Sequence, residues 1–285
     1  MEIKINVPEE LEIKELLDSV KLKVAETKTD EVLKQILNFI DLTSLNGKDT
    51  ENEIIEMTEK VNNFKTKFPK YNNVAAICVY PALVETVKQT LTDKDVSIAA
   101  VGAGFPASQT FLSVKLTECE ICVAKGADEV DVVIPIGKFL SENYFEIVKE
   151  SILIKQVIGE KHLKVILETG DLKSIKNIGI ASYFAIQGGA DFIKTSTGKS
   201  EISATPEAVA TMCYAIKEEF NKSGKKIGIK PSGGIRTSDE AVLYYLIVKE
   251  ILGEEWLNNK LFRFGASSLA NNILSDLEKT SVKYF

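Results

Sequence analysis

Short apolar runs alternate with longer amphipathic stretches from about residue 36 to the end of the 285-residue chain. Glycine, proline or polar turn residues bound each run, and the runs are too apolar to form exposed strands, so they predict buried β-strands. One strand is expected to end near Asp41. Seven more are expected at residues 75–80, 97–101, 129–134, 163–168, 192–195, 227–230 and 261–264.

Apolar residues at helical spacing fill the stretches between these runs and predict one helix after each strand. Helices are expected from Thr50, from Pro81, over 108–125, over 141–158, up to Gly188, over 205–221, from Thr237 and up to 278. Strictly alternating strands and helices indicate a parallel sheet. Eight units without a dinucleotide-binding G-x-G-x-x-G favour a closed (β/α)8 TIM barrel over an open doubly wound sheet.

The domain boundary is expected near residue 35. Residues 1–35 form a predicted N-terminal helical extension, in which Leu11, Leu16, Leu17 and Val20 recur at helical spacing and cap the rest of the molecule. No linker or shift of composition divides residues 36–285, which are therefore expected to form a single barrel domain.

Charge and composition narrow the classes of function. The chain has 35 basic and 41 acidic residues, a net charge of −6, which argues against nucleic acid as a partner. The charged start of the chain and the absence of a membrane-length apolar run predict neither a signal peptide nor a membrane partner. Four cysteines are too few for a disulfide framework, so a reducing, cytoplasmic location is expected, with Cys119 and Cys122 as core thiols.

The single histidine, His162, restricts the chemistry further. A Ser-His-Asp triad needs an imidazole beside its nucleophile, and catalytic zinc usually takes two or three histidines. We therefore expect neither a metal nor any other cofactor. Lysines and carboxylates must then carry any catalysis.

Charged residues interrupt the apolar runs where strands are predicted to end, namely at Asp41, Asp131, Glu168, Lys194 and Lys230. In a barrel the carboxyl ends of the strands hold the active site. Lys194 and Lys230 end consecutive strands, and two ammonium groups in a partly dry cavity lower each other's pKa. The free amine of Lys194 would attack a carbonyl to form a Schiff base. Asp131, two strands away, would reach across the barrel mouth or act through a water; the alternative is a buried Lys–Asp pair without chemistry.

Glycine-rich loops close the last three predicted strands. They are Thr197-Gly198-Lys199, Gly233-Gly234 and Gly265-Ala266-Ser267-Ser268. Glycine lets backbone N–H groups approach an anion, and Ser and Lys add donors. The chain has no nucleotide-binding P-loop, so the phosphate of a phosphorylated carbonyl substrate is the expected anion.

The segments around these residues resemble a deoxyribose-phosphate aldolase, a class I (Schiff-base) aldolase. The resemblance extends from Asp41 to Leu269 and rests on the stretches 41–46, 75–81, 126–133, 191–199, 228–236 and 266–269. The stretches 102–110 and 252–257 resemble the longer, animal-like branch. Ser232 stands where alanine is commoner in the family.

The resemblance implies a role for each matching residue. Lys194 would form the Schiff base, Lys230 would lower its pKa, and Asp131 would assist proton transfer. Asp41, Cys78 and Thr197 would line the substrate pocket. Phosphate would be held by Gly198, Lys199, Gly233, Gly234, Gly265, Ser267 and Ser268. Tyr284 is the candidate for the family's C-terminal tyrosine, which helps to deprotonate the Schiff base.

The implied reaction is the reversible cleavage of 2-deoxy-D-ribose 5-phosphate to acetaldehyde and D-glyceraldehyde 3-phosphate, in deoxyribonucleotide catabolism. The iminium would be the electron sink for breaking the C3–C4 bond. Two other readings stay open: a Schiff-base aldolase or transaldolase-like enzyme for another sugar phosphate, and a non-catalytic sugar-phosphate-binding barrel. A homo-oligomer, dimer or tetramer, also stays open.

Overall fold

A computed structural model describes residue 5 and residues 7–285. Residues 1–4 and 6 of the predicted extension lie outside the described residues. They include most of the charged N-terminal stretch from which we predict that the chain has no signal peptide. None of the helices in the described part of the chain combines the length and apolar character needed to cross a membrane.

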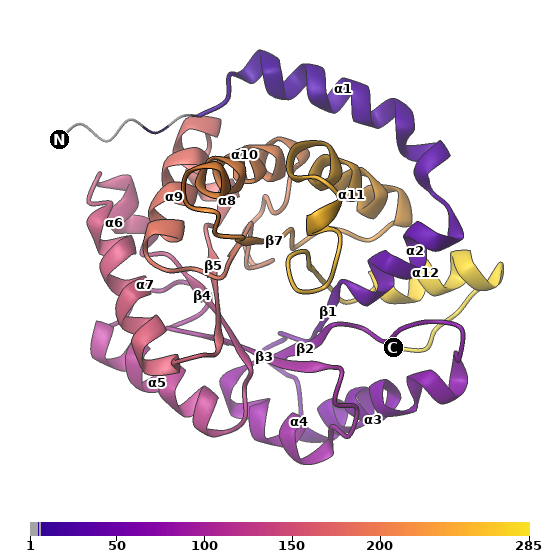
Figure 1. Ribbon diagram of the computed structural model, residues 1–285. Helices are drawn as coiled ribbons and strands as arrows, with labels where there is room; N and C mark the ends of the chain where they lie inside the picture. The colour runs from indigo at the N-terminus through magenta and orange to yellow at the C-terminus, as the bar shows by residue number, and fades with distance from the viewer. Residues whose placement is uncertain (1–4, 6) are drawn as a thin grey trace.

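The described chain forms eight strands that surround a common axis, with helices outside them (Figure 1). The strands are β1 (Ile40–Thr43), β2 (Ala76–Val79), β3 (Ser97–Gly102), β4 (Glu129–Val133), β5 (His162–Ile166), β6 (Phe192–Lys194), β7 (Gly228–Lys230) and β8 (Phe264–Ala266). All the paired strands are parallel, in the order β7-β6-β5-β4-β3-β2-β1-β8. The fold is the predicted TIM barrel.

The ring closes between β7 and β8 through two isolated bridges, Ile229 to Phe262 and Ser232 to Gly265. This seam explains why the last strand was predicted too early. Residues 261–263 contact β7 at the seam, whereas the regular ladder of β8 with β1 pairs Ile40 with Phe264 and Leu42 with Ala266. The first strand also continues past Asp41, to Thr43.

The helices follow the predicted order with shifted ends. They are α1 (Glu10–Thr27), α2 (Asp30–Asn38), α3 (Glu51–Lys67), α4 (Val84–Thr90), α5 (Leu112–Ala124), α6 (Ile136–Leu140), α7 (Phe145–Ile158), α8 (Thr169–Leu172), α9 (Ile175–Gln187), α10 (Pro206–Ser223), α11 (Ser238–Leu252) and α12 (Leu269–Glu278), with 3-10 turns η1 (Pro81–Leu83) and η2 (Glu254–Trp256). The helix expected over 108–125 starts only at Leu112, because Ser108 has a positive φ of 56°. The stretch after β4 divides into α6 and α7 around Glu142, whose φ is 59°.

The predicted N-terminal extension covers α1 and the start of α2, and these helices pack directly on the helices of the barrel. Helix α1 lies across α10 and α11, and α2 lies beside α12 (Figure 1). The buried face of α1 is formed by Ile13, Leu17 and Val20. Leu11, which was expected on this face, is exposed because it points away from the barrel on the opposite side of the helix.

Side chains alternate between two cores because successive residues of a strand point to opposite faces. The outward residues, such as Ile77 and Val130, join a large apolar core under the helices. Inside the ring, β2 and β3 contribute small apolar residues, among them Cys78 and Ala99. The inward positions of β4 are instead Glu129 and Asp131. The barrel interior is therefore apolar on one side and ionic on the other.

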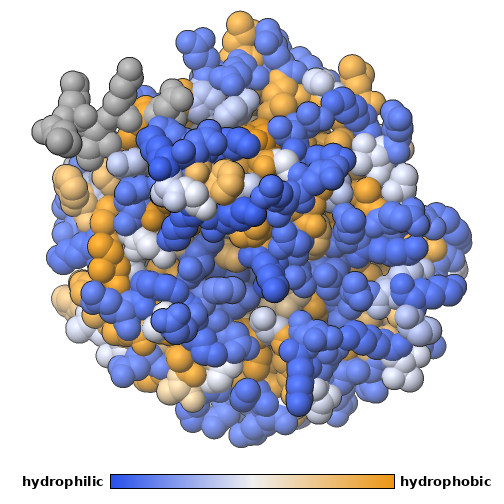
Figure 2. Space-filling model, viewed as in Figure 1, coloured by the Kyte–Doolittle hydropathy of each residue, from blue (hydrophilic) through white to orange (hydrophobic). Residues whose placement is uncertain are grey.

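The surface is mostly hydrophilic, and hydrophobic residues appear singly or in small groups on the face shown in Figure 2. The four cysteines, all within the described residues, are buried and free. Cys119 and Cys122 lie on the inner face of α5, as expected of core thiols.

Candidate active site

Lys194 ends β6 with its side chain inside the barrel, only 3% exposed. Its Nζ donates a hydrogen bond of 2.8 Å to Oδ2 of Asp131 on β4. The same oxygen accepts a 2.7 Å bond from Nζ of Lys230 on β7. Asp131 therefore reaches Lys194 directly across the ring, and no bridging water is needed to join them.

The surroundings of Lys194 favour its neutral form. Burial lowers its pKa, and the Lys230 ammonium lowers it further, against the opposing effect of Asp131. Burial also acts on Lys230, but the carboxylates of Asp131 and Asp41 raise the pKa of Lys230 well above its ordinary value. The pKa values of the two lysines thus shift in opposite directions, and the mutual lowering expected for the pair applies to Lys194 alone.

Asp131 stays ionised between the lysines. Burial alone would raise its pKa, but the ammonium groups of Lys164, Lys194 and Lys230 hold it well below the usual value. An ionised carboxylate 2.8 Å from the Lys194 nitrogen can accept a proton from the adducts of this amine and return it.

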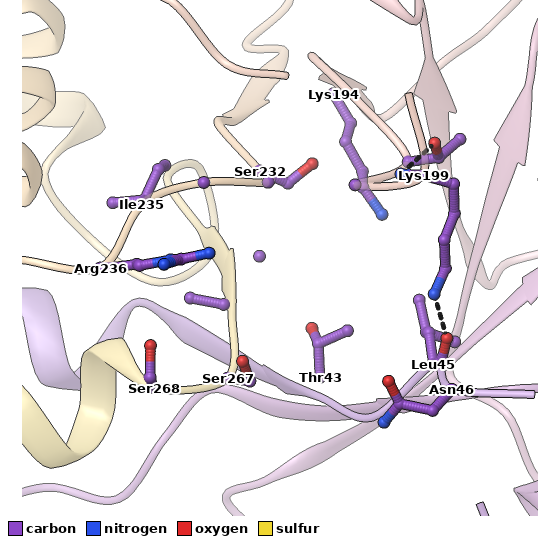
Figure 3. Close-up of a pocket in the computed structure, with 16 residues that line it drawn as sticks. Thr43, Leu45, Asn46, Lys194, Lys199, Ser232, Ile235, Arg236, Ser267 and Ser268 are labelled. Carbon is purple, nitrogen blue, oxygen red and sulfur yellow. Dashed lines mark hydrogen bonds between the residues drawn. The ribbon is translucent and has the colours of Figure 1, made fainter. Parts of the chain in front are cut away.

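A cavity of about 240 Å³ opens above Lys194 at the carboxyl ends of the strands. Figure 3 shows the Lys194 amino group pointing into this space, with Lys199 on one side and Arg236 and Ser268 on the other. The residues predicted to form the phosphate site all line the cavity: Gly198, Lys199, Gly233, Gly234, Gly265, Ser267 and Ser268. Thr197 lines it as well.

The two ends of the cavity differ in character. Lys194 occupies the buried end, whereas exposed Lys199 and Arg236 provide positive charge on opposite sides of the open end. Helix α12 starts at Leu269 beside Ser267 and Ser268, so its first N–H groups add positive potential there. The arrangement suits a substrate that carries a carbonyl at one end and a phosphate at the other.

Glu168 holds one wall of this cavity in place. Its carboxylate accepts a 3.2 Å bond from the backbone N–H and a 2.5 Å bond from the hydroxyl of Thr197. The Thr197 hydroxyl oxygen accepts the backbone N–H of Lys199 at 3.0 Å. Glu168 lies beyond the end of β5 with a positive φ of 55°, so it supports the loop after β6 and does not itself line the cavity.

Steric contacts explain why glycine occupies two positions in the walls of the cavity. A Cβ at Gly265 would lie 2.6 Å from Cβ of Ser232 and 3.2 Å from Cε of Lys230. A Cβ at Gly233 would lie 2.5 Å from the Ser203 hydroxyl, and its φ is 81°. Gly265 is therefore required in part because the Lys230 side chain passes beside it.

Ser232 joins two of the cavity loops. Its hydroxyl donates to the carbonyl of Ser196, and its backbone N–H donates to the hydroxyl of Thr195 at 3.0 Å. The serine that departs from the family's commoner alanine thus adds a link between the loops after β6 and β7.

Three expected site residues lie elsewhere. Asp41 and Cys78 are fully buried inside the barrel, beneath the cavity and not on its wall, because their strand positions point to the axis. Burial raises the pKa of the Cys78 thiol. Tyr284 packs edge-on against Phe68, the C-cap residue of α3, and its hydroxyl donates to the carbonyl of Lys60 on the same helix. The tail is partly buried against α3, where Tyr284 and Phe285 contact Phe64, so Tyr284 is not at Lys194 in this structure.

Sequence reasoning missed four charged residues. Arg236 lines the cavity, and Glu129, Lys164 and Arg263 lie buried inside the barrel. The last three stand within apolar runs, at alternate positions to the outward hydrophobic residues, and this period of two was a usable signal. Within the described residues, His, Cys, Asp and Glu side chains form no cluster of three or more arranged to hold a metal ion.

Comparison with known proteins identifies the family. Residues 35–271 match the family described as DeoC/LacD family aldolase. The deoxyribose-phosphate aldolase of Mus musculus is 42% identical over 87% of this chain and 80% of its own length. The Homo sapiens deoxyribose-phosphate aldolase is 39% identical over 97% of this chain and 89% of its own length. A solved deoxyribose phosphate aldolase from Aeropyrum pernix has a TM-score of 0.68 at 23% identity, covering 94% of this chain and 98% of its own, and so shares the fold. The chain belongs to the DeoC/LacD aldolase family.

Proposed function

We propose that the protein catalyses the reversible cleavage of 2-deoxy-D-ribose 5-phosphate to acetaldehyde and D-glyceraldehyde 3-phosphate. The observation that carries this proposal is the position of Lys194, a buried amine with a lowered pKa that points into a cavity whose far end is cationic. Relatives at about 40% identity bear the name of this activity.

The reaction begins when the neutral amine of Lys194 adds to C1 of the open-chain aldehyde. Loss of water from this adduct gives an iminium, and Asp131 accepts and returns the protons exchanged at the nitrogen. The iminium carbon is C1, so the bond whose electrons it can accept joins C2 and C3. The expected C3–C4 cleavage is therefore wrong on chemical grounds.

Cleavage of C2–C3 takes a proton from the C3 hydroxyl and releases D-glyceraldehyde 3-phosphate. The two remaining carbons stay on Lys194 as an enamine, which takes up a proton at C2. Water then hydrolyses the imine to acetaldehyde and restores the amine. Lys230 stays charged, and its ammonium favours the ionised form of Asp131 between the proton transfers.

The phosphate would bind at the cationic end of the cavity. Lys199 and Arg236 would supply charge, and the backbone N–H groups near Gly233, Gly234 and the start of α12 would supply further donors. In the present structure the Lys199 ammonium donates to the carbonyl of Leu45 at one side of the cavity (Figure 3). Phosphate binding would exchange this contact for an ionic one.

The test combines an activity assay with covalent trapping. The wild-type protein should release acetaldehyde from deoxyribose 5-phosphate with and without chelator, and borohydride should fix the substrate adduct on Lys194. Lys194→Ala should lose at least about 10³-fold in activity. Lys125→Ala removes an exposed lysine, the C-cap residue of α5, and should keep full activity.

An adduct on any peptide without Lys194 would overturn the assignment. Competition among aldehyde donors would separate this activity from that of a related aldolase for another sugar phosphate. Binding of the sugar phosphate without turnover would instead indicate a non-catalytic barrel.

We also infer that the protein forms a homo-oligomer. The Aeropyrum pernix relative is described as a tetramer. Neighbouring helices α5, α6 and α7 expose large apolar side chains, among them Val114, Ile121, Leu140, Phe145 and Ile152. Light scattering should give the mass of a dimer or a tetramer, and a monomer at micromolar concentration would contradict the inference.

A reducing compartment, the cytoplasm, is proposed for its location, because the four cysteines are free thiols. Microscopy of the tagged full-length chain would test it, and localisation in an oxidising compartment would contradict it.

A further inference from the structure

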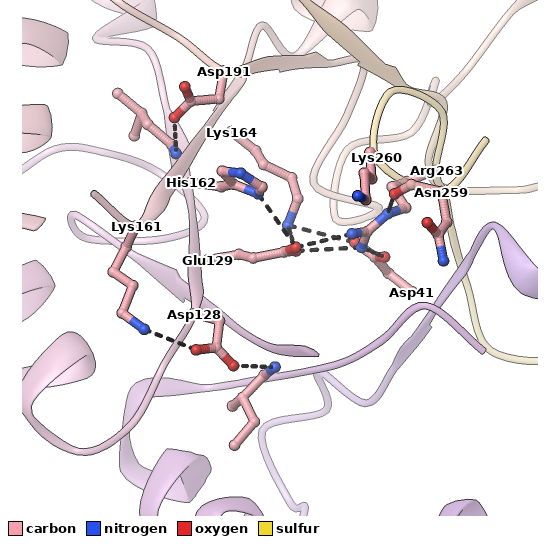
Figure 4. A network of polar contacts seen from close by, with 12 residues as sticks. Asp41, Asp128, Glu129, Lys161, His162, Lys164, Asp191, Asn259, Lys260 and Arg263 are labelled. Carbon is pink, nitrogen blue, oxygen red and sulfur yellow. Dashed lines mark hydrogen bonds and ion pairs between the residues drawn. The ribbon is translucent and has the colours of Figure 1, made fainter. Parts of the chain in front are cut away.

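An ionic cluster extends from Lys194 through the inside of the barrel to its opposite end. Lys164 on β5 donates to Glu129 and, at 2.9 Å, to Oδ1 of Asp131. Arg263, just before β8, binds Asp41 at 2.6 Å and Glu129 at 2.9 Å. Figure 4 shows Lys164, Glu129, Arg263 and Asp41 meeting at the centre, with His162 beside them.

The opposite end of this cluster reaches a second cavity. This cavity, of about 660 Å³, opens at the amino ends of the strands and is lined in part by Glu129, His162 and Arg263. Glu129 and Arg263 are nevertheless almost completely buried. Neither forms an ion pair with Lys194 or lines the cavity above it in the part of the chain that the structure describes.

The charges of the cluster do not balance when every group is ionised. Among the described residues, four cationic side chains, Lys164, Lys194, Lys230 and Arg263, share three carboxylates, Asp41, Glu129 and Asp131. An unbalanced charge inside a barrel is costly, because water cannot solvate it. One cation is therefore favoured to lose its proton.

Geometry selects the cation that does so. Lys164 and Lys230 each bind two carboxylates within 3 Å, and Arg263 also binds two. Lys194 binds Asp131 alone among the described residues, and it shares that oxygen with Lys230. The direction of the pKa agrees: it is lowered for Lys194, and nearby carboxylates raise it for Lys164, Lys230 and Arg263.

We propose that Glu129 and Arg263 are positioning residues that set the protonation of Lys194 through the charge balance of this cluster. The inference rests on the proposed function, because only Schiff-base formation requires Lys194 to be neutral. Other charged or titratable groups that face the cluster are Cys78 from β2 and His162 from β5, whose Nδ1 lies 3.6 Å from Glu129.

Single substitutions at the two positions should shift the apparent pKa of Lys194 in opposite directions. Arg263→Gln leaves three lysines for three carboxylates, so Lys194 should keep its proton to a pH about one unit higher. Glu129→Gln leaves four cations for two carboxylates, so the pKa should fall by a similar amount. At a pH below the pKa, one unit is a tenfold change in the neutral fraction.

The double variant Glu129→Gln/Arg263→Gln separates charge balance from structural damage. It restores a surplus of one cation, so the apparent pKa should return to within about 0.3 units of wild type. Arg263→Lys, which keeps the charge, should do the same. His162→Gln is the matched control, since it alters the same end of the barrel and keeps Glu129, Lys164 and Arg263 in place.

The readout is the rate at which acetaldehyde and cyanoborohydride ethylate Lys194 between pH 6 and 10, measured by peptide mass spectrometry on the folded fraction. Opposite shifts with recovery in the double variant would establish the inference. Shifts in the same direction, no shift, or no recovery in a folded double variant would overturn it. If wild-type Lys194 is not ethylated at any pH, the proposed function itself fails, and the two failures are thus distinct.

Should Arg263→Gln fail to fold, Glu129→Gln and Arg263→Lys decide the question. A lower pKa in the first with an unchanged pKa in the second supports the inference, and any other combination contradicts it.

Discussion

At the scale of single residues, the chemistry of Lys194 depends on the contacts of its neighbours. Lys230 has the same side chain, ends the adjacent strand and is equally buried, yet its pKa moves in the opposite direction because it binds Asp41 as well as Asp131. One additional carboxylate contact thus separates a nucleophile from a permanent cation.

Glu168 is expected to affect binding of the phosphate and not the imine chemistry. Glu168→Gln replaces one acceptor oxygen by an amide donor, so the carboxamide cannot accept both bonds from Thr197. Steady-state kinetics should show KM for deoxyribose 5-phosphate raised about tenfold. Activity on unphosphorylated 2-deoxyribose should change less than about twofold.

Glu201→Gln is the control, because it removes an exposed carboxylate from the loop after β6, which Glu168 supports. If Glu168→Gln lost equal activity on the phosphorylated and the unphosphorylated sugar, Glu168 would support Lys194 itself.

At the scale of elements, the sequence was informative where a local rule determines position. Lys194, Lys230 and Asp131 could be placed because charged residues that interrupt buried parallel strands must point into the barrel, and a barrel brings their ends together. The glycine loops could be placed for the same reason. Their positions follow from the order of the strands and need no tertiary detail.

Tertiary packing decided the rest. The ion pairs of Lys164, Glu129 and Arg263 join strands that are far apart in the chain, so no local pattern pairs them. Tyr284 is placed by contacts of the tail with α3, and the late start of α5 follows from the loop that includes Ser108. Such features depend on which surfaces meet, and a single sequence does not specify that.

Helix α1 offers a stability prediction at this scale. Leu17 is buried against the barrel, whereas Leu22 on the same helix is 86% exposed. Leu17→Ala should lower the free energy of unfolding by about 2–5 kcal/mol, and Leu22→Ala should change it by less than about 0.5 kcal/mol. Urea unfolding measures both. Equal effects would show that α1 does not stabilise the barrel through its buried face.

At the scale of the whole molecule, the ionic interior predicts sensitivity to acid. The pKa values of Asp41, Glu129 and Asp131 are all lowered in the folded state by the buried cations. Their stabilisation is complete above the unfolded values near pH 4 and is lost as the pH falls, because the unfolded chain then binds protons that the folded chain does not.

The free energy of unfolding should therefore fall below pH 4, with a limiting slope of about 4 kcal/mol per pH unit for three protons. Glu129→Gln should reduce the slope by about one proton. Denaturant titrations between pH 2.5 and 6 test this, and a stability that stays level down to pH 3 would contradict it.

The weak backbone seam between β7 and β8 gives the ionic cluster a mechanical role. Where regular ladder bonds give way to two bridges, Lys230 and Arg263 extend from either side of the gap and both bind Asp41. Their ion pairs connect the strands on the two sides of the seam from inside the barrel. A redesign that replaced them with close-packed hydrophobic residues could yield a firmer barrel, but it would remove the charges that make Lys194 reactive. In this protein, the stability of the barrel and the reactivity of Lys194 therefore depend on the same buried charges.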